Sequence, residues 1–183
     1  ANVRRAILFD SQADLLVYGM GETATREIAA RLASGTPVGE IKDVKGTAFI
    51  GDTPADCAYP MVECPSFEEV RADKRQYAAA NQIQYEEHDP VRGKAILQRH
   101  GEKLLIVNPP AMPLTTAELD AVAELPYVRE PHPMYDSMGG VPAIEEVEFS
   151  ITHNRGCFGG CNFCSIAFHQ GRAVTTRGVE SIV

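Results

Sequence analysis

Three cysteines crowded into one short segment constrain this chain more than any other feature. Residues 155–164 read RGCFGGCNFC, which gives Cys157, Cys161 and Cys164 a C-x3-C-x2-C spacing. Thiolate is a soft ligand that selects zinc, copper(I) or iron–sulfur clusters. A structural zinc site is closed by four ligands, often supplied as two distant C-x2-C pairs, and no further cysteine follows Cys164. The spacing therefore favours an iron–sulfur cluster.

Two glycines separate the first two cysteines, and the fourth ligand of a closed site is missing. Gly159 and Gly160 would let the loop approach a cube of iron and sulfide, because glycine adopts dihedrals that other residues avoid. Three thiolates would leave one iron open to a substrate or cofactor. Two alternatives remain. His169 could close a Cys3His site in a zinc-stabilised interaction module, or the segment could be an electron-transfer module, although a ferredoxin normally supplies four cysteines per cluster.

The cysteine motif, with Phe163 directly before its last cysteine, resembles the signature of the radical S-adenosylmethionine (SAM) superfamily. More narrowly, HNRGCFGGCNFCSIAFHQGR resembles the cluster loop of the uncharacterised YgiQ-type members. The resemblance extends upstream over residues 98–135 and, in weaker form, over residues 13–29. It thus covers nearly the whole chain.

The resemblance implies a cofactor, a reaction and a set of site residues. The three cysteines would each bind one iron of a [4Fe-4S] cluster, and the fourth iron would hold the amino and carboxylate groups of SAM. Gly159 and Gly160 would line the cofactor loop, and Phe163 would lie near the adenine. An electron from a donor such as flavodoxin or ferredoxin would cleave SAM to a 5′-deoxyadenosyl radical, which acts on an unknown substrate.

The first 125 residues alternate between apolar runs and helical patterns, which predicts an α/β domain. Segments 6–9, 14–19 and 44–52 are suited to buried strands, and we expect them to be largely parallel. A helix follows the GMGE turn. The layout resembles Rossmann and cobalamin-binding domains, but the chain contains no D-x-H-x-x-G motif, so cobalamin is not predicted.

The stretch Gly19 to Ala24 fits the dinucleotide fingerprint G-x-G-x-x-[GA] between a strand and a helix. The acid that should follow could be Asp52, but it comes later than the usual spacing of about 20 residues. A plain tight turn is therefore the favoured interpretation.

Capping boxes mark two further helices. Ser66 with Glu69 opens a helix over residues 66–88, and Thr115 with Glu118 opens another that ends at Leu125. Between them, KAILQR and EKLLIVN flank His100-Gly101, a pattern that predicts a β-hairpin.

The last third of the chain changes character. Residues 126–145 hold four prolines and are interpreted as a linker. EVEFSIT at 146–152 alternates as a strand does, and the cysteines follow it directly, as a site follows a strand of an α/β barrel. We expect residues 146–183, with a helix from Gly178, to be the start of a truncated radical SAM partial barrel. The chain would then be an inactive fragment of a longer protein.

Composition limits the remaining possibilities. The net charge of −8 argues against a sequence-independent grip on nucleic acid, and no apolar run is long enough for a membrane span. Five cysteines, an odd number with three bunched together, favour metal binding in a reducing cytoplasm over a disulfide framework. Cys57 and Cys64 are interpreted as small, partly buried thiols.

Other polar residues are weaker candidates. Histidines near a cluster can tune it through hydrogen bonds to sulfur, which makes His132, His153 and His169 candidates, with His169 first. Arg155 and Arg172 bracket the cysteine loop. They could offset the charge of a cluster or substrate, but solvated surface arginines are the default expectation.

Overall fold

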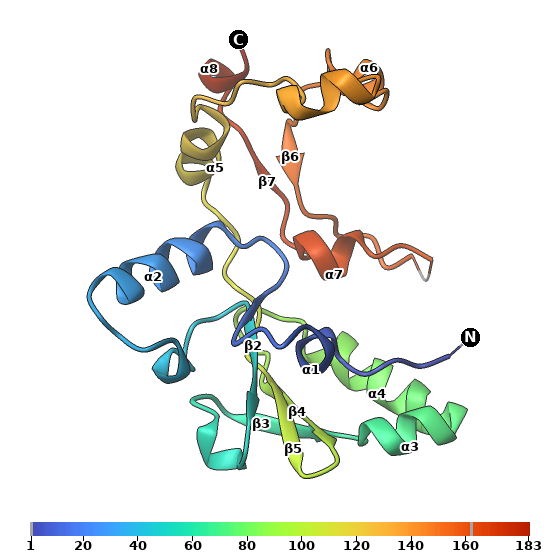
Figure 1. Cartoon of the computed structure of the whole chain (residues 1–183). Helices are drawn as coiled ribbons and strands as arrows, with labels where there is room; N and C mark the ends of the chain where they lie inside the picture. The colour runs from blue at the N-terminus through green and yellow to red at the C-terminus, as the bar shows by residue number, and fades with distance from the viewer. Residues whose placement is uncertain (1, 162) are drawn as a thin grey trace.

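The computed structural model describes residues 2–161 and 163–183. Its largest element is a five-stranded sheet in the order β1-β2-β5-β4-β3 (Figure 1). The strands are β1 (Leu16–Val17), β2 (Thr47–Gly51), β3 (Met61–Cys64), β4 (Ala95–His100) and β5 (Lys103–Val107). The helices of this part are α1 (Ile7–Ser11), α2 (Glu22–Ala33), α3 (Phe67–Ala72), α4 (Lys74–Glu87) and α5 (Thr116–Ala123), with short 3-10 helices η1 (Val38–Glu40) and η2 (Pro54–Asp56).

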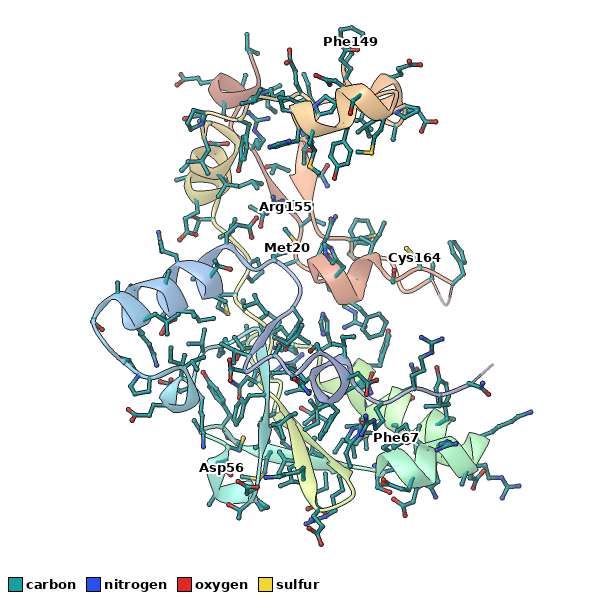
Figure 2. All side chains as sticks on the ribbon, in the orientation of Figure 1. Met20, Asp56, Phe67, Phe149, Arg155 and Cys164 are labelled. Atoms are coloured by element: carbon teal, nitrogen blue, oxygen red, sulfur yellow. The ribbon has the colours of Figure 1, made fainter. Side chains whose placement is uncertain are left out.

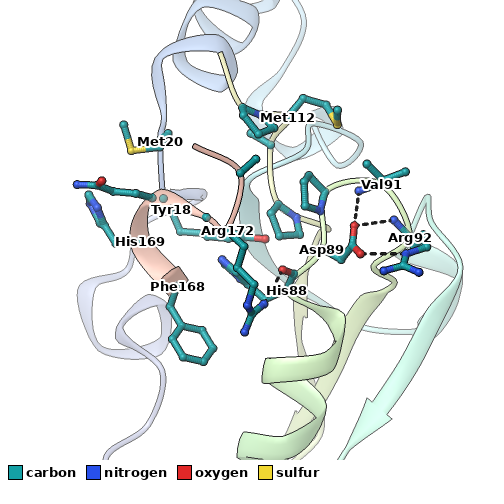
Figure 3. Close-up of a pocket in the computed structure, with 18 of the residues that line it drawn as sticks. Tyr18, Met20, His88, Asp89, Val91, Arg92, Met112, Phe168, His169 and Arg172 are labelled. Atoms are coloured by element: carbon teal, nitrogen blue, oxygen red, sulfur yellow. Dashed lines mark hydrogen bonds and ion pairs between the residues drawn. The ribbon is translucent and has the colours of Figure 1, made fainter. Parts of the chain in front are cut away.

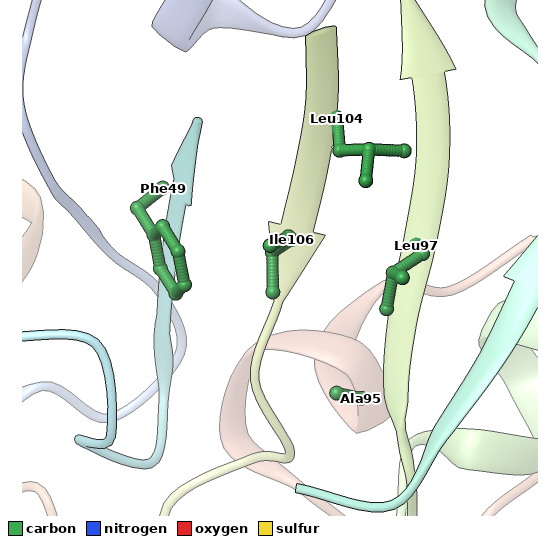
Figure 4. Close-up of a cluster of buried hydrophobic side chains, with 5 residues drawn as sticks. All are labelled: Phe49, Ala95, Leu97, Leu104 and Ile106. Carbon is green, nitrogen blue, oxygen red and sulfur yellow. The ribbon is translucent and has the colours of Figure 1, made fainter. Parts of the chain in front are cut away.

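The core of this part lies on one face of the central strands. Ile106 of β5 pairs with Leu97 of β4 on one side and with Phe49 of β2 on the other. These three side chains, with Ala95 and Leu104, are at most 4% exposed (Figure 4). Burying an aliphatic or aromatic side chain of this size contributes roughly 1.5–3 kcal/mol, so the hairpin and β2 anchor the sheet.

The predicted hairpin is confirmed. β4 and β5 pair antiparallel from Ile96 with Val107 to His100 with Lys103. Gly101 sits in the turn with φ of +63°, in the left-handed region that glycine occupies without strain.

The expectation of a largely parallel sheet is wrong. Only β3 and β4 are parallel, whereas β1–β2, β2–β5 and β4–β5 are antiparallel. The chain returns to the sheet at the edge where β1 ends, because the N–H of Tyr18 donates to the carbonyl of Gly46 over 2.9 Å. β2 must therefore run back along β1. The domain is α/β, but it does not have the parallel sheet of a Rossmann or cobalamin-binding domain.

The predicted strand at 6–9 is also wrong, because these residues open helix α1. A four-residue apolar run fits a buried strand and a short buried helix equally well. Leu8 on this helix is 1% exposed, and Phe9 stacks on His100 with ring centroids 4.4 Å apart. The position of this segment is therefore fixed by the burial of its side chains and not by backbone hydrogen bonds to a neighbouring strand.

Both predicted capping boxes are present. The Ser66 and Thr115 hydroxyls accept the N–H groups of Glu69 and Glu118, whose carboxylates bond back to the cap residues. The helix predicted over 66–88 is two helices, since Asp73 has an extended backbone, ends α3 and caps α4 with its side chain. A short polar side chain can compete for backbone N–H groups in this way.

The chain from 126 onward has little regular structure among its described residues. It contains η3 (Pro133–Met138), α6 (Ile144–Val147), β6 (Asn154–Arg155), α7 (Ile166–Gln170), β7 (Thr175–Thr176) and α8 (Val179–Ile182). β6 and β7 form a two-stranded antiparallel sheet, and α8 confirms the helix predicted after Gly178.

The predicted strand over 146–152 is not formed. Its first residues belong to α6, and its apolar side chains at Phe149 and Ile151 are 91% and 61% exposed. Figure 2 shows Phe149 at the outer edge of this part of the molecule. An alternating pattern gives a strand only where a neighbour pairs its backbone and a layer covers its apolar face. No strand within the described residues pairs with this segment.

Candidate functional site

The cysteine loop runs from β6 to α7, and its two ends are tied together. The N–H of Cys157 donates to the carbonyl of Gly171 over 3.0 Å, and the N–H of Gly156 donates to Oε1 of Gln170 over 3.0 Å. Gly156 has φ of +89°, and a Cβ there would lie 1.9 Å from the carbonyl oxygen of Ala173. Only glycine fits this close approach, so the loop opens at a fixed point.

Two of the three thiols lie around Gly159. A Cβ at Gly159 would lie 3.3 Å from Sγ of Cys157 and 3.8 Å from Sγ of Cys161. The N–H of Gly159 also donates to Sγ of Cys157 over 3.4 Å. Cys161 is exposed, while Cys157 and Cys164 are half-buried. The sulfurs are thus within reach of a group added from solvent.

The described side chains are not assembled to hold a single metal ion. A bound ion needs all its thiolates within about 2.3 Å of one point, and no three His, Cys, Asp or Glu among the described residues form such a group, His169 included. A cube of iron and sulfide instead spreads its three cysteines over three irons. The space left by the missing Cβ of Gly159 and the N–H aimed at sulfur are both features that suit a sulfide-containing group.

Arg155 holds the start of the loop against the sheet domain. Its guanidinium forms an ion pair with Glu22, in the first turn of α2, and both side chains are less than one-third exposed. The default expectation of a solvated arginine is wrong at this position. The ion pair sets β6, which leads into the cysteines, beside the N-terminal end of α2.

Arg172 holds the far end of the loop in a different way. Its guanidinium lies 4.2 Å from the centroid of the Tyr85 ring, and Nη1 donates to the carbonyl of His88 over 3.5 Å. The ring of Phe168 on α7 packs edge-on against Tyr85, with centroids 6.0 Å apart, and tilted against His88 at 5.4 Å. The default expectation of a solvated arginine is therefore wrong here also.

The end of α4 takes part in this site although nothing in its local pattern marks it. The hydroxyl of Tyr85 lies 3.8 Å from the Cβ position of Gly160 in the cysteine loop. Burial, followed by the nearby Arg172 charge, lowers the pKa of His88. These residues meet the loop only through tertiary packing, so an inspection of single segments misses them.

A cavity of about 540 Å³ lies between α7 and the sheet domain. Figure 3 shows Arg172 within it, between Phe168 on α7 and His88 at the end of α4. Its other walls are the turn after β1, with Met20, and the proline-rich segment after β5, with Met112. The cavity thus lies at the edge where β1 and β5 end.

The turn at Gly19 to Ala24 behaves as a plain turn into α2. Gly19 has φ of +70° and Gly21 is the residue before the helix. Asp52, the acid that a dinucleotide site would need, follows the end of β2, which is antiparallel to β1, and it pairs with Lys103. The acid therefore lies at the opposite edge of the sheet from the glycines.

The side chains of two of the remaining candidate residues make local contacts with nearby residues of the chain. Nδ1 of His132 accepts the N–H of Met134, and Nδ1 of His153 contacts Oδ1 of Asn154 at 3.2 Å. Phe163 is 93% exposed, and its place near an adenine stays a prediction.

The two cysteines outside the loop are small, partly buried thiols, as expected. Cys57 is half-buried and contacts the carbonyl of Tyr59 at 3.5 Å, whereas Cys64 is 8% exposed. Burial raises the pKa of the Cys64 thiol to about 11.

Comparison with known proteins decides the family. A model described as "Radical SAM N-terminal" matches residues 1–150. The chain belongs to this radical SAM family. A protein named "UPF0313 protein" from Clostridium botulinum (strain ATCC 19397 / Type A) is 48% identical over 182 residues, which is 100% of this chain and 28% of that protein. A protein of the same name from Clostridium perfringens (strain ATCC 13124) is 50% identical over 181 residues, 99% of this chain and 27% of that protein.

The matches confirm the radical SAM resemblance, but the family model does not cover the whole chain. The family model ends before Cys157, whereas the two clostridial relatives align across the cysteine loop as well. This radical SAM family chain spans about 28% of the length of the curated relatives it matches. No solved structure matches it. Within residues 2–161 and 163–183, no helix combines the length and the apolar character needed to cross a membrane.

Proposed function

We propose that the complete gene product is a radical SAM enzyme whose cluster is held by Cys157, Cys161 and Cys164. The observation that carries the proposal is the arrangement at Gly159, where two thiols and one N–H···S hydrogen bond surround a position without a side chain. Membership of the radical SAM family supports it. The substrate is unknown, and the donor would be a protein such as flavodoxin or ferredoxin in a reducing cytoplasm.

When bound, a [4Fe-4S] cluster with one open iron supplies the electron that cleaves SAM to methionine and a 5′-deoxyadenosyl radical. The residues of the chain would position the cluster. Gly156 fixes where the loop begins, and the Arg155–Glu22 pair holds the preceding strand. Gly159 and Gly160 leave room for the cofactor, and Phe163 would lie near the adenine. A barrel start over residues 146–183 stays part of this proposal.

The test is reductive cleavage of SAM by the complete gene product. After anaerobic reconstitution with iron and sulfide, dithionite and SAM should yield 5′-deoxyadenosine and methionine. The Cys161→Ala variant should yield neither, while Cys57→Ala, at a half-buried thiol outside the loop, should retain the activity. A reconstituted protein that holds its cluster but leaves SAM intact would instead be an electron-transfer module.

A further inference from the structure

The cavity beside α7 contains a cation without a carboxylate partner. No Asp or Glu among the described residues forms an ion pair with Arg172, and the two residues outside the description, Ala1 and Asn162, carry no carboxylate side chain. Among the described residues, its guanidinium makes one hydrogen bond, at 3.5 Å, and its Nη2 is buried without a partner. Half-buried charges are normally paired, so Arg172 lacks an anion.

The acidic groups in the cavity wall are already engaged. The carboxylate of Asp89 accepts the N–H groups of Val91 and Arg92 and the side chain of Arg92. The carboxylate of Glu86 accepts the side-chain amide of Gln82. Neither carboxylate forms an ion pair with the Arg172 guanidinium. No described side chain therefore neutralises the Arg172 charge.

The rest of the cavity is suited to an apolar group. Met20, Met112 and Phe168 contribute to its lining, together with three prolines. Its volume of about 540 Å³ falls within the range of roughly 300–1,000 Å³ that is typical of small-molecule sites, which combine apolar walls with a few polar groups that fix orientation. Methionine walls adapt to irregular apolar shapes.

We propose that this cavity binds a small organic anion whose charged group pairs with Arg172 and whose apolar part contacts Met20, Met112 and Phe168. The planar guanidinium presents its donors in a fork that matches a carboxylate, sulfonate or phosphate. Stacking on Tyr85 holds that fork in place before a ligand arrives. Arg172 and Tyr85 also border the cysteine loop, so the test uses the protein without a cluster.

The test uses 1-anilinonaphthalene-8-sulfonate, which joins apolar rings to one sulfonate, in a fluorescence titration of the complete gene product without a cluster. We expect saturable binding of one probe per chain. Arg172→Gln should weaken this binding at least tenfold, because it removes both the charge and the fork. Arg75→Gln removes an equal charge from an exposed part of α4 and should leave binding within twofold of the unchanged protein.

A second variant keeps the test decisive if Arg172→Gln does not fold. Met112 is 54% exposed at the cavity, so Met112→Trp should fold and should reduce probe binding at least tenfold by filling the space. Unchanged binding in Met112→Trp, or binding in Arg172→Gln within twofold of the unchanged protein, overturns the proposal. Competitive displacement of the probe by SAM would assign the cavity to the cofactor and also overturn it.

Discussion

Residues 2–125 and residues 126–183 differ in how they hold their shape. The first region contains every buried hydrophobic side chain of the described chain, and most of them form three clusters. In the second region Gly156 is the one described residue that is buried. Yet the second region carries the three cysteines. The proposed cluster would therefore be held by a region with no buried hydrophobic core among its described residues.

Contacts with the first region take the place of that core. The Arg155–Glu22 pair, the stacking of Arg172 on Tyr85 and the hydrogen bond from the N–H of Gly178 to Asp120 all join the two regions. Polar and stacking contacts of this kind stabilise less than packed apolar side chains, at roughly 0.5–2 kcal/mol each. The sheet domain therefore supports the cysteine loop through surface contacts, and no described residue of the loop contributes a side chain to the hydrophobic core of the sheet domain.

The largest expected difference is in the response to truncation of a hydrophobic side chain. Leu97 is 1% exposed, so Leu97→Ala should lower the free energy of unfolding by about 2–5 kcal/mol. Phe149 is 91% exposed, so Phe149→Ala should change it by less than about 0.5 kcal/mol. Urea unfolding of this chain measures both. Equal losses would mean that the second region has a core after all.

Thiol reactivity should separate the regions. Burial raises the pKa of the Cys64 thiol to about 11, which lowers the thiolate fraction of Cys64 by about a hundredfold. Burial slows the reaction of Cys64 further. Cys161 is exposed, so iodoacetamide should reach it directly in the protein without cluster. Iodoacetamide labelling followed by peptide mass spectrometry gives both rates at pH 8. Faster labelling of Cys64 than of Cys161 would contradict the burial seen here.

The entrance to the cysteine loop should depend on one glycine. In Gly156→Ala, the new Cβ would meet the Ala173 carbonyl at 1.9 Å, and strain of this kind costs about 1–3 kcal/mol locally. We expect a several-fold loss of iron after reconstitution, measured by iron analysis. Gly139→Ala is the matched control, since Gly139 lies outside the cysteine loop and also has a positive φ, of +93°, but open space around its Cβ position. A greater loss in the control would show that the clash at Gly156 is not the cause.

The smallest expected effect is a pH dependence of the unfolding free energy, caused by His100 in the first region. His100 is stacked between Phe9 and Phe67, and burial lowers its pKa. The unfolded chain therefore binds this proton more readily, so His100 adds stability above its usual pKa of about 6.5, and that stability is lost as the pH falls through the lower folded value. Unfolding free energies at pH 7.5 and pH 5 should differ less in His100→Phe, which keeps the stack. An identical difference would exclude His100 as the source.

The parts of the fold that the sequence predicts well are those fixed by neighbouring residues. The Ser66 and Thr115 capping boxes and the hairpin turn at Gly101 are local and are all present. Strand direction is not local. β2 runs antiparallel because the chain re-enters beside Tyr18, a contact that no pattern within β2 encodes.

The residues of the candidate site also fall into two groups, those that the local sequence identifies and those that only the tertiary structure brings together. The three cysteines can be identified from the motif alone, whereas the role of Gly159 and Gly160 stays a prediction, since neither has a positive φ. Tyr85 and His88 cannot, because they reach the loop from α4 only after the two regions pack together. The alternating segment at 146–152 fails for a related reason, since its pattern needs a pairing partner that the described residues do not provide.

The most direct test of the account is iron and sulfide analysis, with electron paramagnetic resonance, of the complete gene product after anaerobic reconstitution. Cys157→Ala, Cys161→Ala and Cys164→Ala should each lose the [4Fe-4S] cluster, because two thiolates anchor only two corners of the cube. Cys57→Ala and Cys64→Ala should keep about four irons per chain, the content of such a cluster. A protein that binds stoichiometric zinc and no iron would contradict the account, as would a Cys64→Ala variant that loses the cluster while Cys157→Ala keeps it.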